Sequence, residues 1–313
     1  MAKQRGLWSE MEQIMDARER YYWDVTGHLV VRDVLSQEEL DAVNNVLDYV
    51  IGTGIVHQSE DNHGAADSTF LRGTGSRWAH GTSLLELPRP YCDSVRNLLA
   101  HPVVVKYLNV MCGKGFRLDH GPQFNNAVKG TAGLVMHGAG EPHREYVAYH
   151  HQNGEMYCGG VTVTWNLTDC PAGKGGFASV PGSHKSKFRM PIGVRNCDED
   201  MGAVANPGIR AGDVLFFMDG AQSHGTHAWQ NDHDRRSILF KYASRTATRQ
   251  GPSNAVCHPE IFWDRDIVDG MSMEERAVMY GPCSAPPSDE MFLVVEDDGA
   301  VRLENTRDQQ AAD

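Results

Sequence analysis

The sequence predicts a mainly β fold with helical elaboration, whose core is a jelly roll of two antiparallel sheets. From residue 115 onward the chain runs in short segments rich in β-branched and aromatic residues, and glycine or proline separates each segment from the next. A long series of such segments is typical of antiparallel strands in a double-sheet fold. The predicted strands are 116–120, 123–128, 145–150, 157–167, 177–180, 214–218 and 237–244.

Helices are expected before this β-rich part. Apolar residues near helical spacing predict a helix over residues 9–24. Ser36 and Glu39 form a capping box, which predicts that a helix begins there and continues to about Val50. Residues 52–83 are rich in glycine, serine, aspartate and histidine, and they predict a long loop. The remaining predicted elements are a strand at 27–33, helices at 88–100, 102–112 and 272–279, and a strand at 291–295.

The chain is long enough, at 313 residues, to bury a large core, and we interpret it as a single domain. In this interpretation a helical part covers residues 1–113, the jelly-roll core covers 114–245, and a C-terminal extension covers 246–313. The boundaries lie where the series of short β segments begins and ends.

Composition narrows the classes of partner. The net charge is −12 and lysine and arginine do not cluster, so a nucleic-acid polymer is not expected. No apolar run reaches membrane-spanning length, and the first residues contain no apolar signal core. The seven cysteines are scattered without a Cys-x-x-Cys pair, which favours a reducing, cytoplasmic setting. A small-molecule substrate is the partner that we expect.

One histidine and one arginine stand at a spacing that has a chemical use. His224 follows the predicted strand 214–218 after a glycine-containing turn, and Arg235 lies eleven residues beyond His224. An imidazole there can bind a metal ion, while a guanidinium on the neighbouring strand holds the far carboxylate of a dicarboxylate through two charge-assisted contacts. Thr226 can add a hydroxyl to the same carboxylate.

Several stretches resemble the phytanoyl-CoA dioxygenase family of iron(II)- and 2-oxoglutarate-dependent oxygenases. Residues 27–40 are similar to the first strand and helix of that family. Trp165–Asp169, and the Pro-Gly-Ser-His turn that ends at His184, are similar to a strand of its barrel and the turn that follows. His224 and Arg235 are similar to its distal metal ligand and its 2-oxoglutarate anchor.

This resemblance covers roughly residues 20–245 and implies a cupin-like, double-stranded β-helix core. It also implies an enzyme that uses iron(II), 2-oxoglutarate and O2, with His224 as a metal ligand. Arg236 is an alternative to Arg235 as the anchor, because adjacent strand residues face opposite ways. The residues that fall where the family contacts 2-oxoglutarate are Asn125, Trp165, Thr226 and Arg235.

Two stretches compete for the first ligand motif, which in the family reads His-x-Asp. One begins at His137 and the other, His-Gln-Asn, begins at His151 and ends at Asn153. We favour His137, because a strand, a lysine-bearing loop and a histidine follow one another there in the order that the family shows. The Asn153-Gly154 pair is instead a strong hairpin signal.

The motif at His137 lacks the carboxylate that the resemblance predicts. A facial triad supplies two imidazoles and one carboxylate to iron(II). Here the carboxylate position is Ala139, and Gly138 keeps the neighbourhood small. We expect Asp169 and Asp219 to be solvated turn residues.

Three outcomes of this substitution are open. A halide can fill the vacancy and restore the charge, as in the halogenase branch of the superfamily, where this position is Gly or Ala. Glu141 or Glu145 can supply the carboxylate instead, which gives an ordinary hydroxylase. In the third outcome no metal binds, and the fold is a binding module. We favour the first, a halogenase that uses chloride as a cosubstrate at Gly138 and Ala139. Its substrate would be a free small molecule with an unactivated C–H bond, with a nucleotide or another natural-product precursor as candidates.

Overall fold

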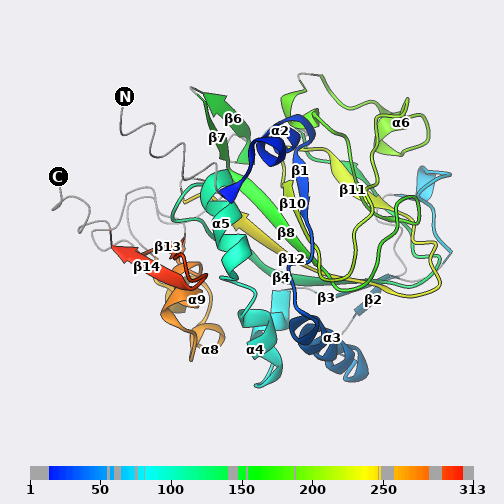
Figure 1. Cartoon of the computed structure of the whole chain (residues 1–313). Coiled ribbons are helices and arrows are strands. Elements are labelled where there is room, and N and C mark those ends of the chain that lie inside the picture. The colour runs from blue at the N-terminus through cyan, green and yellow to red at the C-terminus, as the bar shows by residue number, and fades with distance from the viewer. Residues whose placement is uncertain are drawn as a thin grey trace.

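The computed structural model describes residues 14–54, 57–59, 65–74, 77–80, 82–139, 147–152, 154–186, 188–245, 247, 257–281 and 291–305. Antiparallel sheets form the centre of the molecule, and helices pack around them (Figure 1). The prediction of a mainly β fold with helical elaboration is confirmed. The first part of the helix predicted at 9–24, and the start of the strand predicted at 145–150, lie outside the described residues.

Seven strands form the larger sheet, in the order β1-β10-β8-β12-β4-β3-β2, and every neighbouring pair is antiparallel. The loop predicted over 52–83 is wrong at β2 and β3, because β3 pairs with β4 and β2 pairs with β3 at the edge of the sheet. The strands are β1 (His28–Val31), β10 (Val214–Met218), β8 (Gly160–Asn166), β12 (Arg235–Ala243), β4 (Arg117–Ala127), β3 (Arg77–His80) and β2 (His57–Ser59).

Three short strands form the second sheet, in the order β5-β11-β9. They are β5 (Leu134–His137), β11 (His224–His227) and β9 (Gly176–Ser179). Because β11 is the central strand, its first residue lies between the last residues of its two neighbours. A separate hairpin consists of β6 (Tyr149–Gln152) and β7 (Glu155–Cys158).

Side chains of the larger sheet alternate between two faces. On one face Trp165 and Phe216 belong to the main core, and Phe216 stacks on Tyr107 of helix α5 (Pro102–Met111). On the other face Phe217 packs against Phe177 of the second sheet. Figure 1 shows α5 next to β8 and β10, with β11 beyond β10. The second face therefore looks into the space between the two sheets.

The first two helices of the described chain, α2 (Ala17–Thr26) and α3 (Gln37–Gly52), begin at capping boxes. Helix α2 starts after Asp16, and α3 starts after Ser36, as the Ser36–Glu39 pattern predicted. Within the described residues, none of the helices is long and apolar enough to cross a membrane. The remaining elements are α4 (Tyr91–Arg96), α6 (Ile192–Arg195), α7 (Pro259–Phe262), α8 (Arg265–Val268), α9 (Met273–Ala277), η1 (Ala65–Asp67), η2 (Thr82–Glu86), η4 (Ser183–Lys185), β13 (Met291–Val295) and β14 (Val301–Asn305).

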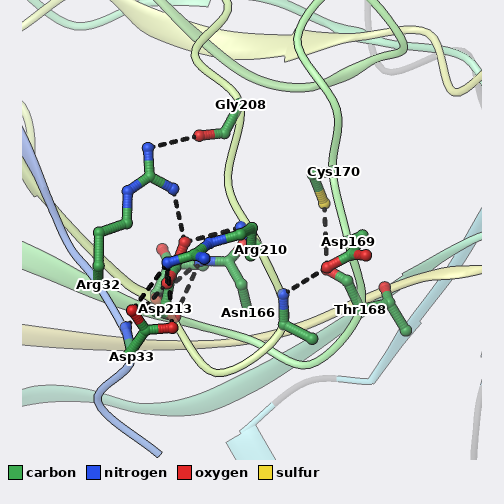
Figure 2. Close-up of polar contacts among 11 residues, drawn as sticks. Arg32, Asp33, Asn166, Thr168, Asp169, Cys170, Gly208, Arg210 and Asp213 are labelled. Carbon is green, nitrogen blue, oxygen red and sulfur yellow. Dashed lines mark hydrogen bonds and ion pairs between the residues drawn. The ribbon is translucent and has the colours of Figure 1, made fainter.

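A buried carboxylate fixes the point where β10 begins. Asp213 is fully buried and accepts hydrogen bonds from Nη1 of Arg32 at 2.6 Å, the backbone N–H of Asp33 at 3.0 Å and that of Arg210 at 2.8 Å. Its backbone carbonyl accepts from the N–H of Asn166, at the end of β8, at 3.1 Å. Figure 2 shows these groups converging on Asp213. The end of β1, the end of β8 and the start of β10 are thereby held together.

Candidate metal centre

His137 and His224 face each other across neighbouring strands of the second sheet. They are directly paired residues of β5 and β11, and their ring centroids are 4.3 Å apart. His224 is buried and His137 is half-buried. Two imidazoles that lie this close on rigid strands are the arrangement required of a pair of histidine ligands.

Backbone carbonyl groups orient both rings through the same ring nitrogen. Nδ1 of His137 donates to the carbonyl oxygen of Val135 at 3.0 Å, and Nδ1 of His224 donates to that of Gln222 at 2.9 Å. A hydrogen on Nδ1 leaves the lone pair on Nε2, as in metal-ligating histidines.

Burial favours the uncharged form of the same two rings. Burial lowers the pKa of His137 below its usual value. Burial, together with the neighbouring His137, lowers the pKa of His224 to about 3. Neutral imidazole is the form that binds a metal ion, so no proton has to be displaced from either ring at pH 7.

The two residues after His137 pack against the turn that leads into His224. The backbone N–H of Ala139 donates to the carbonyl oxygen of Gly220 at 3.0 Å. Gly138 has a φ of 92°, and a Cβ atom on it would lie 2.5 Å from the carbonyl oxygen of Gln222. Glycine is therefore required at position 138, and the position predicted for a carboxylate carries only the methyl group of Ala139.

One carboxylate reaches the histidines from the larger sheet. Asp219 follows β10 directly and is 6% exposed, so the prediction that it is solvated is wrong. Lys241 of β12 compensates its charge, which is why the carboxylate can be buried: Oδ1 of Asp219 lies 3.3 Å from Nζ of Lys241. The same Oδ1 lies 3.9 Å from Nε2 of His224. Among the described residues, no three His, Cys, Asp or Glu side chains are arranged to hold a metal ion.

A pocket between the two sheets brings together three of the four residues predicted to contact 2-oxoglutarate: Asn125 of β4, Thr226 of β11 and Arg235 of β12. Thr226 lies two residues after His224 on one strand, so both side chains face the same side of the sheet. Arg235 is 9% exposed, and its Nε has no hydrogen-bond partner among the described residues. The other lining residues are Asn126, Ala127, Thr131, Ala132, Gly176, His227 and Trp229.

Arg235 and Arg236 point to opposite sides of β12. Nη1 of Arg236 lies 2.8 Å from Oδ1 of Asp48 on helix α3, away from the pocket. Gly176 gives the other guanidinium room, since a Cβ atom there would lie 3.2 Å from Nε of Arg235. Of these two arginines, Arg235 is the one placed to meet a carboxylate in the pocket.

Trp165 and the alternative first ligand lie elsewhere. The ring of Trp165 is fully buried in the helix-covered core and meets His101 edge to face at 5.2 Å. Since side chains alternate along β8, Trp165 and the space between the sheets are on opposite faces. His151 is exposed on the β6–β7 hairpin. Outside the described residues lie Glu141, Glu145 and Asn153.

Comparison with protein families settles the class of protein. The sequence profile of the family described as "Phytanoyl-CoA dioxygenase (PhyH)" matches residues 23–237, more than half of the chain. The chain belongs to the phytanoyl-CoA dioxygenase family. It is thus an enzyme of the iron- and 2-oxoglutarate-dependent oxygenase class, as the resemblance in its motifs predicted.

Solved structures share the fold of this phytanoyl-CoA dioxygenase family member. HygX from Streptomyces hygroscopicus, solved with nickel, 2-oxoglutarate and hygromycin B, matches with a TM-score of 0.60 at 19% identity, covering 76% of this chain and 90% of HygX. AviO1 from Streptomyces viridochromogenes Tue57 gives 0.54 at 16% identity, covering 76% and 99%. The carbocyclase SnoK from nogalamycin biosynthesis gives 0.53 at 16%, covering 74% and 85%. The jelly-roll prediction is confirmed by this shared fold. No curated protein matches the chain.

The donor groups of this family member fit iron(II) and 2-oxoglutarate with one departure. The Nε2 atoms of His137 and His224 are imidazole donors of the kind that iron accepts. The buried, unpartnered Nε of Arg235 fits a carboxylate, because a buried donor of this kind is stable only when it is satisfied. The departure is Ala139, which supplies no carboxylate.

Proposed function

We propose that this protein is an iron(II)- and 2-oxoglutarate-dependent halogenase, which transfers chloride to an unactivated C–H bond of a free small molecule. The observation that carries the proposal is Ala139, which stands at the carboxylate position while His137 and His224 remain oriented as ligands. Two neutral imidazoles leave the charge of iron(II) uncompensated by protein. A halide beside Ala139 would restore the missing negative charge.

Arg235 is the proposed anchor for the distal carboxylate of 2-oxoglutarate, with Thr226 and Asn125 beside it. A two-pronged contact from the guanidinium would satisfy its buried Nε. The structure of HygX with 2-oxoglutarate supports the same cosubstrate here, because the two proteins share a fold. Trp165 is left out of the proposed contacts, since its side chain faces the helices.

In this reaction the protein's own residues position the metal ion and the anion. Iron(II) with 2-oxoglutarate and O2 supplies an oxidant that removes a hydrogen atom from carbon. His137 and His224 fix the position of the metal on two paired strands. Ala139 brings no carboxylate to this centre, and the anion that would take its place is what the substrate carbon would receive.

The second candidate is a hydroxylase that uses Asp219 as its carboxylate. The 3.9 Å between Oδ1 of Asp219 and Nε2 of His224 favours this residue over other carboxylates within the described part of the chain. In that case chloride has no role. Removal of the Asp219 carboxylate would then abolish metal binding along with turnover.

The proposed substrate is a free small molecule, with a nucleotide or another natural-product precursor as the first candidates. Two proteins of the same fold support a small molecule of this kind as the substrate. HygX was solved with hygromycin B, and SnoK is named as a carbocyclase of nogalamycin biosynthesis. Those ligands belong to those proteins, so a panel of metabolites is needed to find the substrate of this one.

Aerobic incubation with iron(II), 2-oxoglutarate, chloride and a metabolite panel, read by mass spectrometry, tests the proposal. A chlorinated product formed together with succinate is the expected result. A hydroxylated product at saturating chloride would point to the hydroxylase. Failure of the wild type to bind iron or to form succinate, with the His137→Ala variant behaving identically, would indicate a binding module.

A further inference from the structure

We propose that Lys241 is a specificity-determining residue, which holds the Asp219 carboxylate away from the two-histidine centre and so keeps the third position open for a halide. This inference rests on the proposed halogenase function and deepens it. It explains how a buried carboxylate can lie beside the two histidines without completing a facial triad. It also identifies the group that separates the halogenase from the hydroxylase.

One oxygen atom of Asp219 faces both partners. Oδ1 lies 3.3 Å from Nζ of Lys241 and 3.9 Å from Nε2 of His224. Two ligand atoms bound at right angles to one metal ion, at bond lengths of 2.0–2.2 Å, are about 3 Å apart. Asp219 is therefore about 1 Å too far from Nε2 of His224 for that geometry. A small movement of one side chain would close the difference.

The ion pair between Asp219 and Lys241 is partly buried. The Asp219 side chain is 9% exposed and that of Lys241 is 26% exposed, so water screens their attraction only partly. The backbone N–H of Asp219 also donates to the carbonyl oxygen of Gly160 at 3.1 Å, which fixes the start of the side chain.

Lys241 faces the site because side chains alternate along β12. The pairing of β12 with β4 shifts register between Leu239 and Lys241, and again between Lys241 and Tyr242. On its other side, Lys241 remains in regular register with Thr162 of β8. Because that pairing is regular, Lys241 and the core residues Phe240 and Tyr242 face opposite sides of β12. This alternation places an ammonium group within reach of the carboxylate beside His224.

Metal affinity, measured separately from turnover, tests this inference. Nickel(II) is titrated into the 2-oxoglutarate-saturated protein by calorimetry, in sodium chloride or in sodium methanesulfonate at equal ionic strength. For the wild type we expect chloride to tighten nickel binding. For Lys241→Met, whose side chain is of similar length but uncharged, we expect about tenfold tighter binding without chloride and no further effect of chloride.

Three further variants separate the explanations. Lys241→Arg keeps the positive charge and should behave as the wild type. Asp219→Asn should keep wild-type nickel affinity and the chloride effect, and this result is informative even if Lys241→Met does not fold. The double variant Lys241→Met, Asp219→Asn should lose the gain in affinity, because the freed carboxylate is gone.

The titrations distinguish a failure of the inference about Lys241 from a failure of the proposed halogenase function. If Lys241→Met folds and binds nickel with unchanged affinity and unchanged response to chloride, the inference about Lys241 is overturned while the halogenase proposal stands. A loss of tenfold or more in nickel affinity in Asp219→Asn would show that Asp219 is already a ligand, which overturns the inference and favours the hydroxylase. No nickel binding by the wild type in either salt would overturn the proposed function itself.

Discussion

The backbone of Gly138 packs against the carbonyl oxygen of Gln222, the same oxygen that accepts the Nδ1 hydrogen of His224. The residue after one histidine ligand therefore touches the group that orients the other. The side chain of Gln222 extends this connection, since its Nε2 donates to the carbonyl oxygen of Thr26 at the end of helix α2. The orientation of His224 depends on the absence of a Cβ atom at position 138.

Gly138→Ala should weaken metal binding by about tenfold or more, because the new methyl group displaces the Gln222 carbonyl and frees the His224 ring. Gly113→Ala is the matched control. Gly113 has a φ of 83°, and among the described residues no atom lies within 4 Å of the point that a Cβ atom on it would occupy. The control therefore carries the backbone strain without the clash. Nickel titration of both variants measures the effect. Equal affinities in the two variants would contradict the role given to Gly138.

Arg235→Leu should weaken 2-oxoglutarate binding by about 2–5 kcal/mol, the cost of leaving a bound carboxylate without its charged partner. Metal affinity should be preserved, since the guanidinium lines the pocket and does not belong to the histidine pair. Titration of 2-oxoglutarate into the nickel-loaded protein measures the loss. Arg236→Leu is the control and should bind 2-oxoglutarate normally, because Arg236 pairs with Asp48 on α3. The reverse pattern would move the anchor to Arg236.

Helices and strands whose formation depends on neighbouring residues alone were predicted from the sequence. The Ser36–Glu39 capping box starts α3 where expected, because both of its hydrogen bonds join residues three apart. The run Val214–Met218 was predicted with the bounds of β10, since a strand buried on both faces is apolar throughout. Strands β5 and β11 were not predicted. Each is four residues long and includes histidine, and each is a strand only because it pairs with a distant segment.

The sequence proposes His137, His224 and Arg235 from motifs, whereas burial decides the placement of Trp165 and Asp219. The positions of His137, His224 and Arg235 followed from spacing and resemblance, and the structure brings the two histidines together. The orientation of Trp165 could not be predicted, because every residue of β8 is buried and the sequence shows no alternation between faces. The charge of the buried Asp219 is paired with Lys241, which lies on another strand and could not be matched to it from the sequence.

The protein should lose stability as the pH falls from 6.5 toward 4, and His28 should account for part of the loss. Burial lowers the pKa of His28 from 6.5 to about 4. The unfolded chain therefore takes up a proton in this range while the folded chain does not, so the stabilisation is complete above pH 6.5 and is lost below it. The contribution is at most about 3 kcal/mol. Urea unfolding at pH 5 and 7.5 should give a smaller difference for His28→Gln than for the wild type. Identical differences would contradict the prediction.

Asp213→Ala should lower the free energy of unfolding by about 3 kcal/mol, because it leaves Arg32 and two backbone N–H groups without their buried acceptor. Asp33→Asn is the control, because asparagine tolerates the positive φ of 53° at this position. The Asp33 side chain is 76% exposed and pairs with the exposed Arg210, so its loss should cost less than about 1 kcal/mol. Urea unfolding measures both. A cost for Asp213→Ala as small as that of the control would contradict the structural role of this carboxylate.

The mass of the product formed by the wild type and by Ala139→Asp, each with chloride and with bromide, tests the central claim most directly. The wild type should give a chlorinated product in chloride and a brominated product in bromide, because the position beside His137 is open to either anion. In Ala139→Asp the new carboxylate should occupy that position and exclude both halides by space and charge. Halogenated product should then disappear, while nickel still binds. An oxygenated product from the wild type at saturating chloride, with no halogenated product in either salt, would contradict the assignment of Ala139 as a halide site.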